Sequence, residues 1–293
     1  MTEIKEGCRQ RVALVTDSSA CLPEDQISRH KITVVPTVLV WDGQELRDAV
    51  DISNEEFWRR LAWDPVLPST STMSPYAYVS AFSTARQIGD SVLCAVIPSR
   101  MSSMADVARA AICLYKDDRD VTVVETGAAA MAHGFPVLLG ARAASAGADA
   151  SHVEDVVRRA VDASAIVAVV DSLKYLARSG RIPRLVAHTA NVLPASVIFS
   201  MRRGRIRAWP SFGSRARAIQ GMITYVRRVA TKSNYLGVAV HHAANVSEGH
   251  ELAELVRTEL RPDDLFVTGF TPVMGAHVGP RVLGLSYCSR PDS

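Results

Sequence analysis

Paired cysteines are missing from this chain of 293 residues. Its five cysteines are odd in number and scattered, and no two of them form a C-x-x-C pair. A disulfide framework or a zinc site would need closer spacing, so we expect reduced thiols and no bound metal. The chain also has no apolar run long enough to span a bilayer, and residues 1–7 contain no apolar signal core. These absences predict a cytoplasmic protein with no stable membrane insertion.

Nucleotide-binding and serine-hydrolase motifs are absent as well. The sequence contains no G-x-x-x-x-G-K-[ST] loop, no G-x-G-x-x-G after its first predicted strand and no G-x-S-x-G elbow. We therefore do not expect ATP or NAD bound through those motifs, or catalysis at a nucleophile elbow. The prediction is a protein without a cofactor.

Acidic residues are missing from one long interval, residues 172–247. It holds 13 of the 33 lysines and arginines and none of the 30 acidic residues. Such a basic stretch can contact an acidic partner, a phosphate or an anionic membrane surface, the last as a transient contact, or it can be a solvated face. Few aromatic residues are interleaved with these arginines, which argues against binding of nucleic acid. The sequence does not choose between an anionic contact and a solvated face.

The first half of the chain alternates apolar runs with amphipathic segments. This alternation predicts βαβ units, that is, a parallel sheet with helices on both faces. We assign the resulting N-terminal α/β domain to residues 8–160. Its predicted strands are residues 12–16, 32–40, 91–97 and 121–124. Its predicted helices are residues 53–61, 75–87, 130–147 and 152–163. Two further helices are predicted, one that begins at residue 24 and one that ends at residue 115.

The second half, residues 161–288, has a different pattern. Paired strands with few helices predict a C-terminal α+β domain with a mixed or antiparallel sheet. A turn at Arg203-Gly204 is predicted to close a hairpin. The predicted strands are 166–170, 195–201, 206–209, 235–241, 265–268 and 282–287, and the predicted helices are 215–231 and 248–260.

Two hydroxyl-rich stretches lie in the first third of the chain. Residues 68–75 read P-S-T-S-T-M-S-P, and residues 99–103 read S-R-M-S-S. Both are predicted beyond the carboxyl ends of the parallel strands, where ligands of such sheets gather. Hydroxyls and free backbone N–H groups before a helix suit an anionic oxygen group. No strong base or metal cluster accompanies them, so the pattern favours an anion-holding site over a catalytic one.

Three further segments carry candidate polar residues. His241 and His242 are adjacent in a predicted strand and would point to opposite faces, which favours a structural role over a metal pair. His277 lies among the small residues 275–280, which form either a tight loop or a close approach to a ligand. The Asp17-Ser18-Ser19 segment follows the first strand and fits helix capping better than ligand binding.

Several segments together resemble the DegV family of bacterial fatty-acid-binding proteins. Residues 16–19 are similar to its opening T-D-S-[ST], 68–71 to P-x-T-S, 101–102 to the start of L-S-G-T, 170–182 to V-D-T-L-x-x-L with G-G-R-I, and 275–280 to G-T-H-x-G-P. Each motif is weak alone. Their order and spacing extend over residues 12–285, nearly the whole chain.

This resemblance implies that the two domains bury a long-chain fatty acid at their interface. Thr70 and Ser102 would hydrogen-bond its carboxylate, and a loop at His277 would close the site. The resemblance also implies five other lining residues: Ser71, Met101, Gly279, Asp17 and Ser18. A separate fatty-acid kinase would then act on the presented carboxylate, with Arg181, Arg202 and Arg203 contacting that partner or a phosphate. Such a protein is a carrier and not an enzyme.

Two other functions fit parts of the sequence. A phosphate-handling transferase or hydrolase would use Ser102 as nucleophile with His277 as its base. A regulatory module would bind nucleic acid through the basic interval, and this is the weaker of the two.

Overall fold

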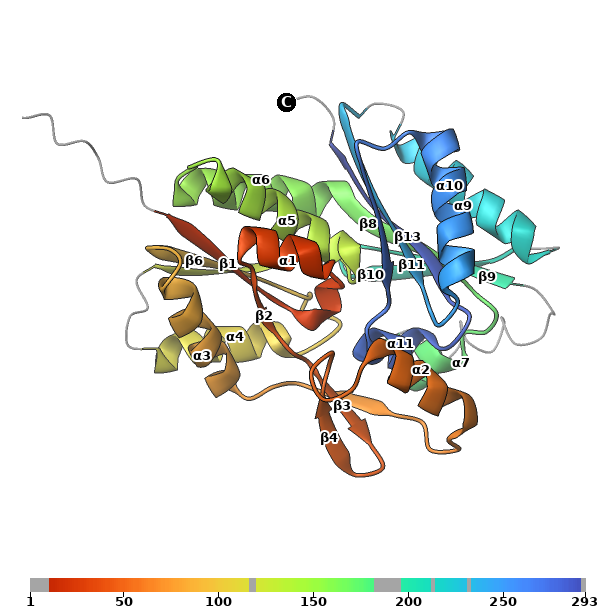
Figure 1. Ribbon diagram of the computed structural model, residues 1–293, viewed down its shortest axis with the longest axis horizontal. Coiled ribbons are helices and arrows are strands. Elements are labelled where there is room, and N and C mark those ends of the chain that lie inside the picture. The colour runs from red at the N-terminus through yellow and green to blue at the C-terminus, as the bar shows by residue number, and fades with distance from the viewer. Residues whose placement is uncertain (1–10, 116–119, 182–195, 212–213, 231–232, 291–293) are drawn as a thin grey trace, which may run out of the picture.

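The computed structural model describes residues 11–115, 120–181, 196–211, 214–230 and 233–290, and it has two main sheets (Figure 1). Residues 8–10, 182, 195 and 231, which belong to predicted boundaries or motifs, lie outside these ranges. The four cysteines within them are free thiols. No helix in the described ranges is long and apolar enough to cross a membrane.

The first sheet is wholly parallel and has the strand order β2-β1-β6-β7. Side chains of β1 alternate between two apolar clusters: Ala13 and Val15 face one side of the sheet, and Val12 and Leu14 face the other. Helices α3 and α4 cover the first side, and α5 and α6 cover the second (Figure 1). The predicted parallel sheet with helices on both faces is confirmed. Its elements are β1 (Val12–Asp17), β2 (Thr33–Val35), β6 (Ser91–Val96), β7 (Val121–Glu125), α1 (Glu24–His30), α3 (Pro75–Arg86), α4 (Met104–Leu114), α5 (Met131–Ser145) and α6 (Ala150–Ala163).

The second sheet is mixed, with the order β10-β9-β8-β13-β11-β12, and only its β11–β12 pair is parallel. One face packs against α9 and α10, whereas the other faces α5, α6 and the first half of the chain. The predicted fold class is therefore confirmed, while a domain division at residue 160 stays a prediction. The elements are β8 (Ser164–Val170), β9 (Ser196–Arg202), β10 (Arg205–Ser211), β11 (Tyr235–His242), β12 (Asp264–Gly269), β13 (Leu283–Arg290), α9 (Arg215–Ala230) and α10 (Val246–Leu260).

The predicted strand 32–40 is wrong as a single element. It divides at Pro36, and β3 (Val38–Trp41) leaves the parallel sheet to pair with β4 (Gln44–Arg47) and β5 (Ser69–Ser71). Proline lacks an N–H and cannot extend a central ladder, which explains the break. Residues 69–71 of the first hydroxyl-rich stretch consequently lie on a strand of this small sheet and not at the carboxyl edge of the parallel one.

Short helices complete the fold near the small sheet. Helix α2 (Asn54–Trp63) begins as predicted, because the Ser53 hydroxyl accepts from the Glu56 N–H at 3.1 Å. The predicted loop at His277 is instead helix α11 (Pro272–Val278), with proline at its first position. Two more short elements are η1 (Ser18–Ala20) and α7 (Lys174–Arg178).

Candidate functional site

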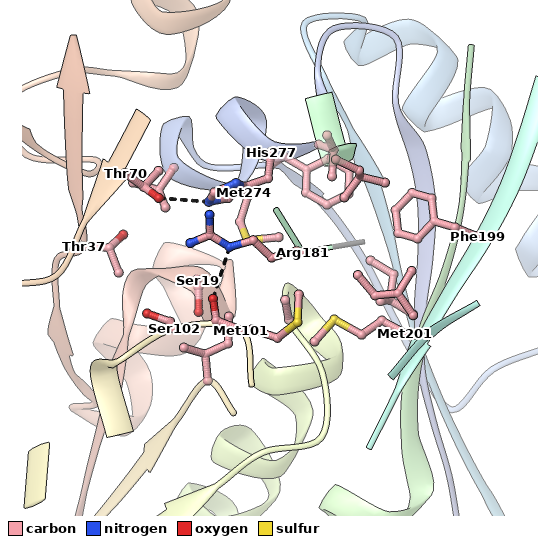
Figure 2. Close-up of a pocket in the computed structure, with 18 of the residues that line it drawn as sticks. Ser19, Thr37, Thr70, Met101, Ser102, Arg181, Phe199, Met201, Met274 and His277 are labelled. Carbon is pink, nitrogen blue, oxygen red and sulfur yellow. Dashed lines mark hydrogen bonds between the residues drawn. The ribbon is translucent and has the colours of Figure 1, made fainter. Parts of the chain in front are cut away.

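A narrow cavity of about 80 Å³ lies between the two halves of the chain. Its polar lining residues Ser19, Thr37, Thr70 and Ser102 gather on one side in Figure 2, and Phe199 and Met201 of β9 lie on the other. The cavity therefore has a polar end and an apolar end. The remaining lining residues are Ser71, Ile97, Met101, Ala129, Ile166, Leu176, Arg181, Ile206, Phe270, Val273, Met274, His277 and Val278.

Thr70 and His277 meet at the polar end. Thr70 lies on β5 opposite Leu39 of β3, and its Oγ1 is 3.1 Å from Nε2 of His277 on α11 (Figure 2). Burial, together with the positive charges of Arg181 and Arg178, lowers the pKa of His277 to about 3, so the ring is neutral near pH 7. If Nε2 carries the proton, it donates to Thr70 and leaves the threonine proton available for a ligand.

Arg181 brings a positive charge into this cavity. Its Nε donates to the Met101 carbonyl at 3.2 Å, and its Nη1 donates to the Ser179 carbonyl at 2.6 Å. Among the described residues no carboxylate is paired with this half-buried guanidinium, and burial lowers its pKa. Burying a charged guanidinium without a carboxylate partner is unfavourable unless an anion binds next to it.

Ser102 comes from the turn between β6 and α4. Its Oγ accepts the Met104 N–H at 3.4 Å, so its own proton is not committed to that contact. The turn is fastened at Ser99, whose N–H and hydroxyl both donate to Glu125 at 2.8 Å. In the second hydroxyl-rich stretch, Ser102 therefore lines the cavity, whereas Ser99 stabilises the turn.

Ser19 lines the cavity but was not among the predicted site residues. Its N–H and its hydroxyl both donate to Asp17, and its Oγ lies 3.3 Å from Nδ1 of the buried His133. Because the carboxylate takes the hydroxyl proton, Ser19 is a poor donor to a second anion. The capping prediction for this segment is confirmed, since Asp17 caps η1.

Asp17 and Ser18 are absent from the lining of this cavity. Both face a second cavity of about 280 Å³ beside Asp48. The Ser18 hydroxyl donates to Asp48 at 2.6 Å, and the Thr37 hydroxyl donates to the same carboxylate at 3.2 Å. Burial raises the pKa of Asp48, which also accepts the Val273 N–H at the start of α11 at 3.0 Å. Asp48 thereby ties η1 to the helix that carries His277.

Only some of the other predicted site residues line the same cavity. Ser71, Met101, His277 and Arg181 join Thr70 and Ser102 in the cavity lining, but Gly279 does not. Gly279 ends α11 at φ +79°, where a Cβ would overlap the Tyr175 ring.

Arg202 and Arg203 lie in a separate arginine-lined groove at the β9–β10 hairpin, and both contact Asp162.

His241 and His242 have separate surroundings, as expected for a structural pair. Nε2 of the fully buried His241 accepts the Met131 N–H at 3.3 Å, whereas Nδ1 of His242 contacts the Ala243 carbonyl. Within the described residues no three His, Cys, Asp or Glu side chains form a metal-binding group.

The arrangement suits an amphipathic anion. Ser102 has a hydroxyl proton available, and so does Thr70 when Nε2 of His277 carries the ring proton. Arg181 supplies the opposite charge, and apolar side chains line the far end. Sequence motifs identified the two hydroxyls. The missed residues Ser19 and Thr37 carry no sequence signal that separates them from helix-capping or turn hydroxyls.

Comparisons with known proteins agree on one family. The family model described as "Uncharacterised protein, DegV family" matches residues 11–290. A DegV domain-containing protein of Clostridium acetobutylicum is 28% identical over 279 residues, covering 94% of this chain and 97% of that protein.

Solved structures give the same relationship. A fatty-acid-binding DegV-family protein of Thermus thermophilus has a TM-score of 0.85 and 25% identity, and the match covers 95% of this chain and 99% of that one. A stearic-acid-binding protein of Eubacterium ventriosum, with a TM-score of 0.87, 23% identity and coverage of 95% and 98%, shares the fold. The family match extends from the first strand to the last, and the chain belongs to the DegV family.

Proposed function

We propose that this protein binds one long-chain fatty acid between its two halves. The observation that carries the proposal is the half-buried Arg181, which has no carboxylate partner among the described residues and lies in a cavity that is otherwise hydroxylic at one end and apolar at the other. The Thermus thermophilus relative, described as binding fatty acid, supports the same ligand class.

In this proposal Thr70 and Ser102 donate hydrogen bonds to the carboxylate, and Arg181 balances its charge. Ser19 and Thr37 are excluded as donors because their protons are committed to Asp17 and Asp48. Neutral His277 holds the Thr70 hydroxyl through Nε2 and orients it toward the ligand. Charge-assisted hydrogen bonds of this kind are about twice as strong as neutral ones.

The acyl chain would enter the apolar end beside Phe199. The cavity is smaller than the roughly 300–1,000 Å³ of small-molecule sites, so we propose that its walls move when the ligand binds. Met101, Met201 and Met274 line it, and unbranched thioether side chains change conformation readily. We therefore propose that these methionines shift to open a tunnel.

The protein acts in this proposal as a carrier that presents the carboxylate to a fatty-acid kinase. A hydrolase or transferase would instead need a base beside Ser102. His277 bonds Thr70, and the Ser102 hydroxyl contacts the Met104 amide. Kinase-dependent formation of acyl phosphate from the loaded protein tests the carrier step separately from fatty-acid binding.

Native mass spectrometry of the purified full chain tests binding directly. We expect a bound acid of a few hundred daltons, or uptake of added oleate. A ligand-free mass that does not change when oleate or palmitate is added would contradict the proposal.

Variants test the two hydroxyls. Thr70→Val and Ser102→Ala should each weaken oleate binding by about 1.5–3 kcal/mol, the range for a hydrogen bond to a charged group. The matched control is Ser83→Ala with Thr84→Val, since both hydroxyls are exposed and bond only to carbonyls within α3. Equal affinity of the site variants and the control pair would remove Thr70 and Ser102 from the carboxylate site.

A further inference from the structure

A groove of about 610 Å³ lies on the opposite side of the β9–β10 hairpin from the cavity lining. The groove shares no lining residue with the proposed fatty-acid cavity. Its volume lies within the usual range of ligand-binding sites. None of the described residues that line it is aliphatic. The lining residues are Arg100, Ser200, Arg202, Arg203, Arg205, Arg207 and Tyr225.

Like charges are held close together in this groove. Arg205 lies directly opposite Arg202 in the β9–β10 ladder, and Arg207 lies opposite Ser200. The hairpin turn between them, Arg203-Gly204, has positive φ at both residues, as in the tight turns that fix strand register. Like charges directly opposite each other destabilise a sheet, so the fold tolerates a repulsion here that a ligand could relieve.

Few acidic groups compensate these arginines. Asp162 contacts Arg202 through its backbone carbonyl and Arg203 through its carboxylate. Within the described part of the chain, no carboxylate is paired with Arg100, Arg205 or Arg207. The groove therefore has more positive than negative charge and is open to an anion.

We propose that this groove binds the phosphate chain of a small oligophosphate ligand. Four of the five arginines that line the groove have no carboxylate partner among the described residues. A single phosphate carries only about two negative charges near pH 7, so a chain of phosphates balances their charge better. Planar guanidinium groups are suited to bidentate contacts with phosphate oxygens. A bilayer surface is flat on this scale and would not fill a hollow lined by arginines.

The position of Arg100 connects the groove to the rest of the molecule. Arg100 directly precedes Met101 and Ser102 in the chain, and its side chain packs beside Gly204 of the hairpin. A bound oligophosphate would thus bridge the β9–β10 hairpin and the turn that carries Ser102. This site does not depend on the fatty-acid proposal, because it is defined by other side chains.

Calorimetric titration of the full chain, stripped of lipid, with inorganic tripolyphosphate tests the site at about 0.15 M ionic strength. We expect saturable binding at one site. Arg205→Ala combined with Arg207→Ala should weaken it at least about tenfold, as expected for lost charge-assisted hydrogen bonds. The control pair, Arg217→Ala with Arg257→Ala, removes two exposed arginines outside the groove and should change the affinity less than about threefold.

Thermal unfolding provides a second measurement. Without ligand, the Arg205→Ala, Arg207→Ala variant should be at least as stable as the native chain, because it removes like-charge repulsion. Tripolyphosphate should raise the Tm of the native chain and of the control pair but not of the groove variant.

Three results would overturn the proposal. The first is no tripolyphosphate binding, and the second is equal weakening in both variant pairs, which would indicate a general effect of net charge. The third is binding of hexaglutamate, or of vesicles containing phosphatidylglycerol, with the same arginine dependence and without competition by tripolyphosphate. That result would assign the surface to an acidic peptide or a membrane.

Discussion

Replacing Arg181 by glutamine separates ligand binding from fold stability. In the ligand-free protein the change removes hydrogen bonds to two neutral carbonyls, those of Met101 and Ser179. Each is worth about 1.5–3 kcal/mol, because the guanidinium donor is charged. It also removes a half-buried charge whose burial is itself unfavourable. These effects oppose each other, so we expect the free energy of unfolding to change by less than about 1 kcal/mol.

Ligand affinity should respond much more strongly. With a carboxylate bound, Arg181 contributes a charge-assisted contact worth about 1.5–3 kcal/mol. Its loss should raise the Kd for oleate about 10- to 150-fold. Arg181→Lys keeps the charge but not the planar fork, and it should lose less affinity than Arg181→Gln.

The assay compares oleate titration and urea unfolding on the same lipid-free preparations. Arg217→Gln is the control, because Arg217 is an exposed arginine on α9 that does not line the cavity. Two results would refute the reasoning: an unchanged oleate Kd in Arg181→Gln, or a loss of several kcal/mol in stability without ligand. The second would make Arg181 a structural residue whose burial needs no anion.

Three further predictions concern the surroundings of the site. Ser19→Ala should leave the oleate Kd within about threefold. It should lower the free energy of unfolding in urea by about 1.5–3 kcal/mol, because the buried carboxylate of Asp17 loses a hydrogen-bond donor. A large loss of oleate affinity would instead make Ser19 a donor to the ligand. Gly279→Ala should destabilise by at least about 1–3 kcal/mol, because its backbone at φ +79°, ψ 176° is nearly exclusive to glycine and its Cβ would overlap Tyr175; a native Tm would contradict this. Burial lowers the pKa of His241 to about 3, so its contribution to stability is fully present above pH 6.5 and is lost as the pH falls toward 3, by at most about 1.4 kcal/mol per pH unit. Between pH 3 and 6.5, the slope of the free energy of unfolding against pH should therefore be shallower in His241→Gln than in the native chain. Identical slopes would show that His241 is not a source of this pH dependence.

The spacing of apolar residues predicted most of the long helices and strands, because a segment buried on one face repeats its apolar residues at a regular interval. The alternation along β1 places Val12 and Leu14 against one pair of helices and Ala13 and Val15 against the other. The Ser53 N-cap likewise fixes the start of α2, because its hydroxyl accepts the Glu56 N–H only three residues along the chain. Such features are local and can be recognised without knowledge of tertiary contacts.

The short elements at the site could not be predicted in the same way. Strand β5 has three residues, and its partner β3 lies about thirty residues earlier, so its existence depends on a non-local ladder. Helix α11 did carry start and stop signals, Pro272 at its first position and Gly279 at its end. Gly275 and Ala276 between them favoured a loop. Packing explains the glycine, because a Cβ at Gly275 would overlap the Phe57 and Trp58 rings of α2.

The choice among the hydroxyls of the site depends on where each proton goes, and residue types alone do not give that. Ser19 and Thr37 line the same cavity as Thr70 and Ser102, yet both donate to buried carboxylates. The Ser102 oxygen accepts an amide proton, and Thr70 can accept from the ring of His277, which leaves their own protons for an incoming anion. A carboxylate needs donors, so the cavity selects the two hydroxyls that are not already donating. In the proposed site, the direction of each hydrogen bond therefore leaves one pair of hydroxyls to donate to the ligand, while the other pair donates to carboxylates within the first half of the chain.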